Sequence, residues 1–421
     1  MIRRFLTTTA ILTGMTGSAL AADRAAVLDT YADIAAAGYA DSQATAETLR
    51  AAVADLIAAP SEATLSAARA AWLAARVPYQ QTEAFRFGNP LVDDWEGKVN
   101  AWPLDEGLID YVDADYPAAE GENMLAALNV IANPRPVIAG VEVDASRITP
   151  ELIADTLDMA DGMETNVARG YHAIEFLLWG QDLNGTGPGA GARPYTDFVT
   201  GPGCTGGHCD RRADYLRAAT DLLVADLAEM AALWAPGGAA RAAVTEDEAA
   251  GISAILTGMG SLSYGELAGE RMKLGLLLND PEEEHDCFSD NTHNSHYYDG
   301  LGIRNVYLGR YVRPDGSVIE GPSVSDLVAE TAPEVDAEMR ARLDTTVTAL
   351  DALRTAAEGG MAYDMMLARG NDTGEVLIQT AVDGLVAQTR SIERVVAALD
   401  LGGISIEGSD SLDDPAAAVA Q

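Results

Sequence analysis

Basic residues, cysteines and long apolar runs are all scarce in this 421-residue chain. Its 27 Lys and Arg stand against 65 Asp and Glu, which gives a formal net charge of −38 at pH 7. Such a surface repels nucleic acid and anionic lipid, and it attracts cations without specificity. Adaptation to salt is the simpler explanation of this charge, and a cation-gathering function is the alternative. Past residue 22, no stretch has the roughly 18 consecutive apolar residues of a membrane span. We therefore expect no transmembrane segment and no nucleic-acid partner.

The first 22 residues have the pattern of a signal peptide. Arg3 and Arg4 make a positive start, residues 5–20 are mostly apolar, and a small-x-small cleavage site ends at Ala21. No cysteine follows that would carry a lipid anchor. We expect cleavage near Ala21 or Ala22 and a soluble mature protein in the periplasm or cell envelope.

The three cysteines suit an oxidising compartment. Cys204 and Cys209 enclose a short Gly-rich loop, and we predict a disulfide bond between them. A metal site made by these two cysteines and His208 is the alternative. Cys287 is then either a buried thiol or the partner of one of the loop cysteines.

Helical patterns dominate the rest of the chain, and the strand signal is thin. Helices are predicted over residues 23–57, 61–77 (continuing beyond a kink at Pro78), 149–178, 211–234, 246–279, 323–357 and 372–399. Residues 88–118 and 280–322 are predicted to be irregular. The expected fold is therefore all-α, with two helical-bundle domains and long irregular loops. The expected boundaries are 23–180 and 211–405 for the bundles, 181–210 for a Gly-rich crossing loop, and 406–421 for a flexible tail.

A histidine and a glutamate, His172 and Glu175, lie three residues apart inside an apolar helical pattern. On a helix this spacing puts both side chains on one face. Because Ile174, Leu177 and Trp179 surround them, the pair would be costly to bury without a partner. A metal ion is the partner that suits one imidazole and one carboxylate best, so His172 and Glu175 are predicted metal ligands.

Further ligands must come from facing segments, as in carboxylate-rich bundle sites. Glu83, an acid among aromatic residues, is the first candidate, and Asp105, just past a Trp-Pro pair, is the second. The alternatives are structural: Glu83 pairs with Arg76 or Arg86, and Asp105 caps a helix that starts at Glu106.

The second half of the chain offers candidates for the facing side of this pocket. Glu266 and Glu270 lie four residues apart on one helical face beside Arg271, which can neutralise an acid or hold an anionic ligand. A solvated acidic face is the alternative. His285, His293 and His296 lie among Asp286, Asp290 and Asp299, but their spacing matches no standard zinc or calcium pattern. They are interpreted as surface or hydrogen-bonded histidines, with a second metal site as the alternative, and His293 is the one expected to face the interface. Arg86, close to Glu83, is assigned to the same interface.

The motif Gly170-x-His172-x-x-Glu175, followed by Phe-Leu-Leu-Trp-Gly, resembles the signature of the imelysin family, in particular its iron-regulated protein A-like branch. Further similar blocks lie, in a consistent order, at residues 72–88, 100–105, 263–272 and 285–293. The resemblance implies two related helical bundles that face one another in an exported protein. The iron regulation of that branch implies iron uptake or handling in the envelope.

The family has been classed with metallopeptidases, but the expected peptidase chemistry is not visible in this sequence. A zincin helix needs a second histidine four residues after the first, and Phe176 stands there instead. No separate general base can be identified. The leading hypothesis is an envelope protein that binds iron, with zinc or manganese as alternatives, either as the ion or as a small metal chelate. It would pass the metal to an envelope uptake partner. A metallopeptidase with unusual ligands and an interaction module with a structural His/Glu pair are the other two hypotheses.

Overall fold

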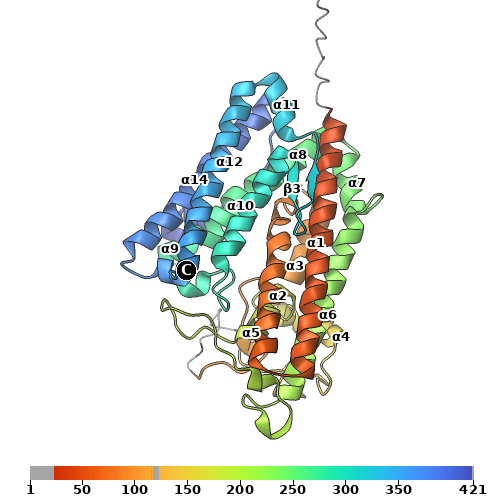
Figure 1. Cartoon of the computed structure of the whole chain (residues 1–421), viewed down its shortest axis with the longest axis vertical. Helices are drawn as coiled ribbons and strands as arrows, with labels where there is room; N and C mark the ends of the chain where they lie inside the picture. Colours follow the sequence, from red (N-terminus) through yellow and green to blue (C-terminus); the bar gives the residue numbers. More distant parts are fainter. Residues whose placement is uncertain (1–22, 115, 117–122, 420–421) are drawn as a thin grey trace, which may run out of the picture.

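The computed structural model describes residues 23–114, 116 and 123–419, and these form an all-α fold (Figure 1). The predicted fold class is confirmed, because the strands of the described chain are confined to two short antiparallel pairs. They are β1 (Val137–Ile138) with β2 (Val141–Glu142), and β3 (Arg310–Val312) with β4 (Val318–Glu320). The predicted signal peptide lies outside the described residues. Within those residues, no helix combines the length and the apolar character needed to cross a membrane.

Three long helices form a first group along the long axis of the molecule (Figure 1). α2 (Glu62–Gln80) and α6 (Cys209–Trp234) both pack along α1 (Arg24–Ala58). The start of α2 is fixed by a capping box, in which the side chains of Ser61 and Thr64 each accept a hydrogen bond from the other residue's backbone N–H. Pro78, where we expected a kink, lies in the last turn of α2, and the helix continues to Gln80.

A second group is built from α10 (Thr292–Leu308), α12 (Pro333–Glu358) and α14 (Asp372–Ala398). α12 packs against both of the others, and a π-helical segment, Leu262–Lys273, packs on α14. α10 also contacts α2, so it connects the second group to the first. Figure 1 shows this group inclined beside the first.

The packing of α6 differs from the expected organisation of the chain. We expected residues from 211 onward to open the second bundle, yet α6 packs against α1 and α5 (Gly170–Trp179) of the first group. Its apolar face, which includes Leu216, Leu223 and Leu227, is buried. α7 (Ala239–Thr245) also packs on α1, and α8 (Glu248–Ser261) contacts both α1 and α14.

Two helices lie in regions that the sequence pattern left irregular. α3 (Pro90–Asn100) falls within residues 88–118, and α10 falls within residues 280–322. Apolar periodicity misses α10 because its buried positions include polar residues such as Ser295, His296 and Asp299. When polar side chains are buried, the helix no longer shows the alternation of apolar buried and polar exposed positions by which an amphipathic helix is recognised.

The predicted helix over residues 149–178 is interrupted in the structure. α4 (Pro150–Leu152) continues as a π-helical segment at Ile153–Leu157, and the helix ends there. Met159 and Asp161 have φ values of 54° and 59°, which a right-handed helix does not allow. The helix resumes only as α5.

α5 is short and completely buried, and it carries the His/Glu motif. It lies against α2, α3 and α6. Gly170, at its start, has φ 82°, and a Cβ atom there would lie 2.5 Å from the carbonyl oxygen of Val99. Only glycine therefore allows α3 and α5 to approach this closely, which sets the position of His172 two residues later.

The Gly-rich crossing segment is held by buried charges and a covalent link. Arg193 and Arg212 both donate to the carboxylate of Asp110, at 2.8 and 2.6 Å. Cys204 and Cys209 are joined by a disulfide bond with an S–S distance of 2.02 Å, and Cys287 is a free thiol. The segment is therefore anchored on both sides of its Gly-rich part.

The end of the described chain packs back on the second group. Where we expected a flexible tail, Ser411 donates a hydrogen bond to the carbonyl of Gly269, and Glu407 N–H donates to Ser261. The remaining helices are α9 (Leu274–Leu278), α11 (Val324–Thr331), α13 (Tyr363–Leu367), α15 (Asp410–Asp413) and α16 (Pro415–Ala418). Short 3-10 turns occur at Glu83–Phe85, Glu106–Leu108, Ala160–Gly162, Tyr195–Phe198, Gly201–Gly203 and Pro281–Glu283.

Candidate metal centre

The two motif side chains of α5 contact each other directly. His172 Nδ1 lies 3.2 Å from Glu175 Oε2, and both side chains are buried. The other oxygen, Glu175 Oε1, accepts hydrogen bonds from the backbone N–H of Ser289 at 3.0 Å and from its hydroxyl at 2.6 Å. Glu175 therefore connects the histidine to a segment more than a hundred residues away.

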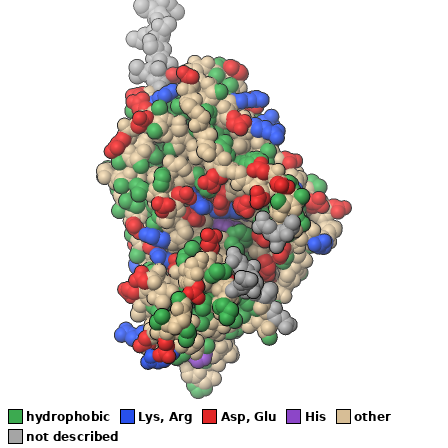
Figure 2. All heavy atoms as spheres, turned by 180° about the vertical axis from the view of Figure 1, so that it is seen from behind, with side chains coloured by type: hydrophobic (Ala, Val, Ile, Leu, Met, Phe, Trp, Pro, Cys, Tyr) green, Lys and Arg blue, Asp and Glu red, His purple; other side chains and the backbone are tan. Residues whose placement is uncertain are grey.

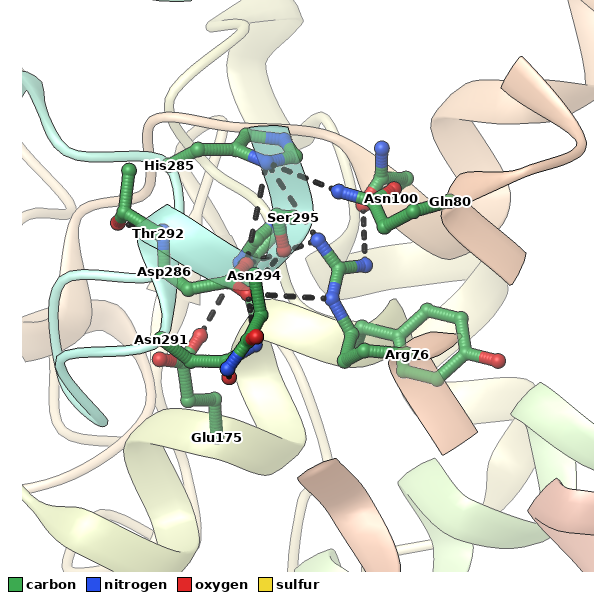
Figure 3. Close-up of polar contacts among 12 residues, drawn as sticks. Arg76, Gln80, Asn100, Glu175, His285, Asp286, Asn291, Thr292, Asn294 and Ser295 are labelled. Atoms are coloured by element: carbon green, nitrogen blue, oxygen red, sulfur yellow. Dashed lines mark hydrogen bonds and ion pairs between the residues drawn. The ribbon is translucent and has the colours of Figure 1, made fainter. Parts of the chain in front are cut away.

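That segment, which leads into α10, brings His285 and Asp286 next to the motif. The Asp286 carboxylate accepts hydrogen bonds from the side chains of Asn291 and Ser295, and its backbone N–H donates to the Thr292 hydroxyl (Figure 3). These contacts come from the first turn of α10, so the start of that helix fixes the direction in which Asp286 points.

His172, His285 and Asp286 form a cluster that we call the His/Asp cluster. Each offers a ligand atom, and these atoms lie within 4.8 Å of one another; no other such group of three was found among the described residues. Asp286 Oδ1 lies 3.8 Å from the Nδ1 atoms of both histidines. The two imidazole rings are 4.7 Å apart between centroids. Two imidazoles and a carboxylate are ligands typical of zinc, manganese and iron.

An arginine from α2 already supplies a positive charge to the His/Asp cluster. Arg76 Nη2 lies 2.8 Å from Asp286 Oδ1 and 3.4 Å from His285 Nδ1, and Nη1 donates to Asn100 at 2.6 Å (Figure 3). A guanidinium only donates, so the lone pair of neutral His285 lies on Nδ1. The charge of Asp286 is thus balanced by Arg76.

Burial and this arginine determine the protonation of the cluster. Burial lowers the pKa of His172 to about 3, and Arg76 adds to the effect. Burial also holds the pKa of His285 well below its usual range, with Arg271 contributing. Burial by itself raises the pKa of Asp286, but Arg76 and His172 outweigh it, so the net pKa is lowered. Both imidazoles are therefore neutral at pH 7, as metal ligands must be, and Asp286 is ionised.

The pKa of Glu175 is shifted in the opposite direction to those of His172, His285 and Asp286. Burial raises its pKa well above the usual range, and the neighbouring Asp286 raises it further, against the hydrogen bonds from Ser289. A positive ion near His172 would favour the ionised form. The ionised carboxylate accepts the Nδ1 proton of His172, and this leaves the lone pair of the imidazole on Nε2.

His172 Nε2 is buried and has no hydrogen-bond partner in the described part of the chain. Gln80 Oε1 and Tyr79 Oη, both from α2, are likewise buried without partners. Buried polar atoms are rarely left unpaired in folded proteins. The residues therefore fit a metal ion: once Glu175 is ionised, the unpartnered Nε2 of His172 would carry a lone pair, and the same histidine belongs to a cluster with a second imidazole and a carboxylate.

Glu83 and three of the predicted interface residues lie in another cluster. Arg271 Nη2 donates to Glu83 at 2.8 Å and contacts Glu266 at 2.7 Å, while its Nη1 lies 3.0 Å from Asp299. Arg86 lies 3.6 Å from Glu266. The sequence offers Arg76 or Arg86 as ion-pair partners of Glu83, but in the structure its partner is Arg271, from the other half of the chain. The carboxylate of Glu83 therefore forms an ion pair with Arg271 and does not lie in the His/Asp cluster.

The remaining candidates are also placed away from the His/Asp cluster. The carboxylate of Asp105 accepts hydrogen bonds from Asn123, Thr165 and Tyr116, and the side chain does not cap the turn at Glu106–Leu108. Glu270 is exposed. His293 Nε2 lies 3.1 Å from the side-chain amide of Asn294.

The sequence does not connect His285, Asp286 and Arg76 with His172. His285 and Asp286 stand in a family-like block, but their sequence pattern suggests only a separate site shared with the other histidines of that segment. The usable signal was the adjacency of an imidazole and a carboxylate in a family-like block. Arg76, in the block at 72–88, was considered only as a partner of Glu83.

The fold and the site together define a class: an all-α protein with a buried His/carboxylate cluster where α5 meets the segment before α10. The profile of the imelysin family (Peptidase_M75) matches residues 35–392. The chain therefore belongs to the imelysin family.

Individual relatives are more distant. Iron-regulated protein A of Synechococcus elongatus is 45% identical over 51 residues, which cover 12% of this chain and only 14% of that protein. A solved structure of a candidate iron-regulated protein A precursor from Parabacteroides distasonis has a TM-score of 0.65 at 20% identity, covering 91% of this chain and 97% of the other. An imelysin-like protein from Psychrobacter arcticum has a TM-score of 0.52 at 16% identity, covering 91% and 98%. At these identities the structural similarity establishes the fold.

Proposed function

We propose that this chain is an envelope metal-binding protein that holds iron at the His/Asp cluster for uptake or delivery. His172, His285 and Asp286 would bind the ion, and Glu175 would orient His172. Iron is favoured over zinc and manganese because two relatives carry iron regulation in their names. The nitrogen and oxygen donors suit all three ions.

The single observation that carries the proposal is the buried Nε2 of His172, which has no partner among the described residues. Its ring is already fixed through Nδ1 by Glu175. Metal-binding histidines commonly donate the other ring N–H to a carboxylate, which sets the tautomer and strengthens the ligand.

Arg76 adds a condition to the proposal. Because the guanidinium contacts Asp286 and His285, a cation at these residues must compete with a charge the chain already supplies. Arg76 also donates a hydrogen bond to Asn100, so the guanidinium keeps one partner when its contact with Asp286 is lost. We infer that binding of iron weakens the Arg76–Asp286 contact. The binding residues would then exchange one cation for another.

The hydrolytic alternative finds less support in the cluster. A metallopeptidase needs a carboxylate or histidine placed to activate water. In the described cluster, Glu175 is bonded to His172 and Ser289, and Asp286 is bonded to Arg76, Asn291 and Ser295. Both carboxylates are thus engaged. A chain that cleaves a broad peptide library, and loses this activity on His172→Asn, would favour the peptidase instead.

The test is metal binding by the purified mature chain under anaerobic conditions. Ferrous, manganous and zinc ions are titrated into the wild type, His172→Asn, Asp286→Asn and a matched control, His208→Asn. His208 is an exposed histidine in the crossing loop, and Asn tolerates its positive φ of 49°. We expect at least a tenfold loss of affinity for the first two variants and no change for the control. Equal binding by all four proteins would refute the proposal and leave the interaction module as the better hypothesis.

A further inference from the structure

A cavity of about 420 Å³ lies on the other side of the segment that carries His285 and Asp286. Glu284, Cys287 and Phe288 of that segment line the cavity, whereas His285 and Asp286 belong to the His/Asp cluster and Ser289 donates to Glu175. Trp102 also lines it, and the Trp102 ring lies 5.8 Å from the His285 ring. One stretch of backbone and one indole therefore separate the cavity from the His/Asp cluster.

Carboxylates dominate the polar lining of this cavity. Eight of its described lining residues are acidic, and none is Lys or Arg. They include Glu106, Asp182, Asp280, Glu282, Glu284 and Asp364. On the face opposite that of Figure 1, acidic side chains surround a central hollow in which basic and His side chains also come to the surface (Figure 2). Acidic walls of low dielectric focus a negative potential, which concentrates cations.

Two of these carboxylates have an oxygen without a partner. Glu106 is 5% exposed and Glu284 is 1% exposed, yet Glu106 Oε2 and Glu284 Oε2 make no hydrogen bond to any described residue. Burial raises the pKa of Glu106 to about 7, against a hydrogen bond with Tyr116. Glu106 is therefore partly ionised at pH 7, and a cation in the cavity would favour the ionised form.

We propose that this cavity is a second cation-binding site, which takes a di- or trivalent metal ion with its water shell and holds it through outer-sphere hydrogen bonds. It is separate from the His/Asp cluster and does not depend on iron binding there. No three carboxylates of the cavity offer ligand atoms within 4.8 Å of one another in the described chain, so a bare ion would not find three protein ligands there. Six waters at about 30 Å³ each take up roughly 180 Å³. The cavity has room for such an ion.

An exchange-inert complex tests this inference directly. Hexaamminecobalt(III) has the charge and size of a hydrated trivalent ion, and it cannot lose its ammines to a protein ligand. Binding is measured by titration at about 0.15 M salt, where screening over about 8 Å suppresses contacts with exposed acids. We expect a saturable site in the wild type, at least tenfold weaker in Glu106→Gln/Asp364→Asn. His172→Asn should bind the complex within twofold of the wild type.

The control removes the same charge elsewhere. Glu246→Gln/Glu393→Gln changes two exposed acids outside the cavity and should bind like the wild type. If the buried variant fails to fold, Leu183→Arg replaces it, since Leu183 lines the cavity mouth and is 69% exposed. This arginine should weaken binding by the same factor.

Two results would overturn the inference. The first is equal binding of the cobalt complex by the wild type, the cavity variants and the control, which would mean that only the general acidity of the surface attracts it. The second is displacement of the complex by spermidine at a tenfold lower concentration than by magnesium, which would assign the cavity to an organic cation. Loss of ferrous binding in His172→Asn reports on the His/Asp cluster alone, so the two proposals can fail separately.

Discussion

Replacement of Glu175 by Gln changes one atom of the candidate metal centre and should block the proposed ligand position of His172. The two oxygens of Glu175 accept from opposite sides: one faces His172 Nδ1 at 3.2 Å, and the other receives the N–H and hydroxyl of Ser289. A Gln side chain has a single acceptor oxygen. The backbone N–H of Ser289 can only donate, so the Gln oxygen turns toward Ser289 and its NH₂ faces His172. His172 must then accept at Nδ1 and carry its proton on Nε2, where a metal would bind.

The expected loss follows from this tautomer change. Removal of a carboxylate that orients a metal-binding histidine lowers metal affinity by about 10- to 100-fold. This corresponds to roughly 1.4–2.7 kcal/mol of binding free energy. The substitution keeps the size of the side chain, so the helical content of the protein should not change.

The assay is anaerobic calorimetry with ferrous ion, accompanied by circular dichroism of each variant. Ser289→Ala is the matched control, because it removes one hydrogen bond to Glu175 but leaves the carboxylate and the Ser289 N–H in place. We expect less than a threefold loss for this control. Binding by Glu175→Gln within twofold of the wild type would show that Glu175 does not set the tautomer of a ligand, and the reasoning would fail.

Three further predictions follow from the buried charges. Arg76→Gln should raise the affinity for ferrous ion, because it removes the competing cation. It should also lower the melting temperature, because Asp286 loses its buried ion-pair partner at a cost of about 3–5 kcal/mol. A reduced affinity would show instead that Arg76 helps to hold the ligand. Glu83→Gln should lower the melting temperature without changing ferrous affinity, since Glu83 pairs with Arg271; a tenfold loss of affinity would return Glu83 to the ligand set. The pKa of His172 is about 3 in the folded protein, against about 6.5 in the unfolded chain, so the unfolded state binds the proton first as the pH falls. The stability advantage of neutral His172 is therefore complete above pH 6.5 and decreases below it. Urea unfolding should show the wild type losing about 1 kcal/mol more than His172→Asn between pH 6.5 and 5.5, and parallel losses would contradict the depressed pKa.

The sequence predicted the all-α class, the family and the local geometry of the motif. Helical spacing was enough to put His172 and Glu175 on one face, because that relation depends only on neighbouring residues. The contact between α5 and the segment before α10 depends on long-range packing, which periodicity does not encode. This is why Asp286 was not recognised as part of the site.

Long-range packing also explains why the sequence assigned Glu83 to the wrong cluster of residues. Glu83 and Arg271 lie 188 residues apart in sequence, and no local pattern distinguishes Arg271 from Arg76 or Arg86 as the partner of Glu83. The break between α4 and α5 was missed for a related reason. Met159 and Asp161 both adopt positive φ values, and a methionine rarely does so, which indicates that tertiary contacts determine the backbone there.

X-ray diffraction from ferrous-loaded crystals, with anomalous data on either side of the iron absorption edge, tests the central claim most directly. The account predicts one anomalous peak at the His/Asp cluster, within bonding distance of His172 and with Arg76 shifted from Asp286. The peak should be absent from crystals of His172→Asn prepared in the same way. An iron peak elsewhere with no histidine ligand, or no peak in crystals of protein that had been saturated with iron, would contradict the account.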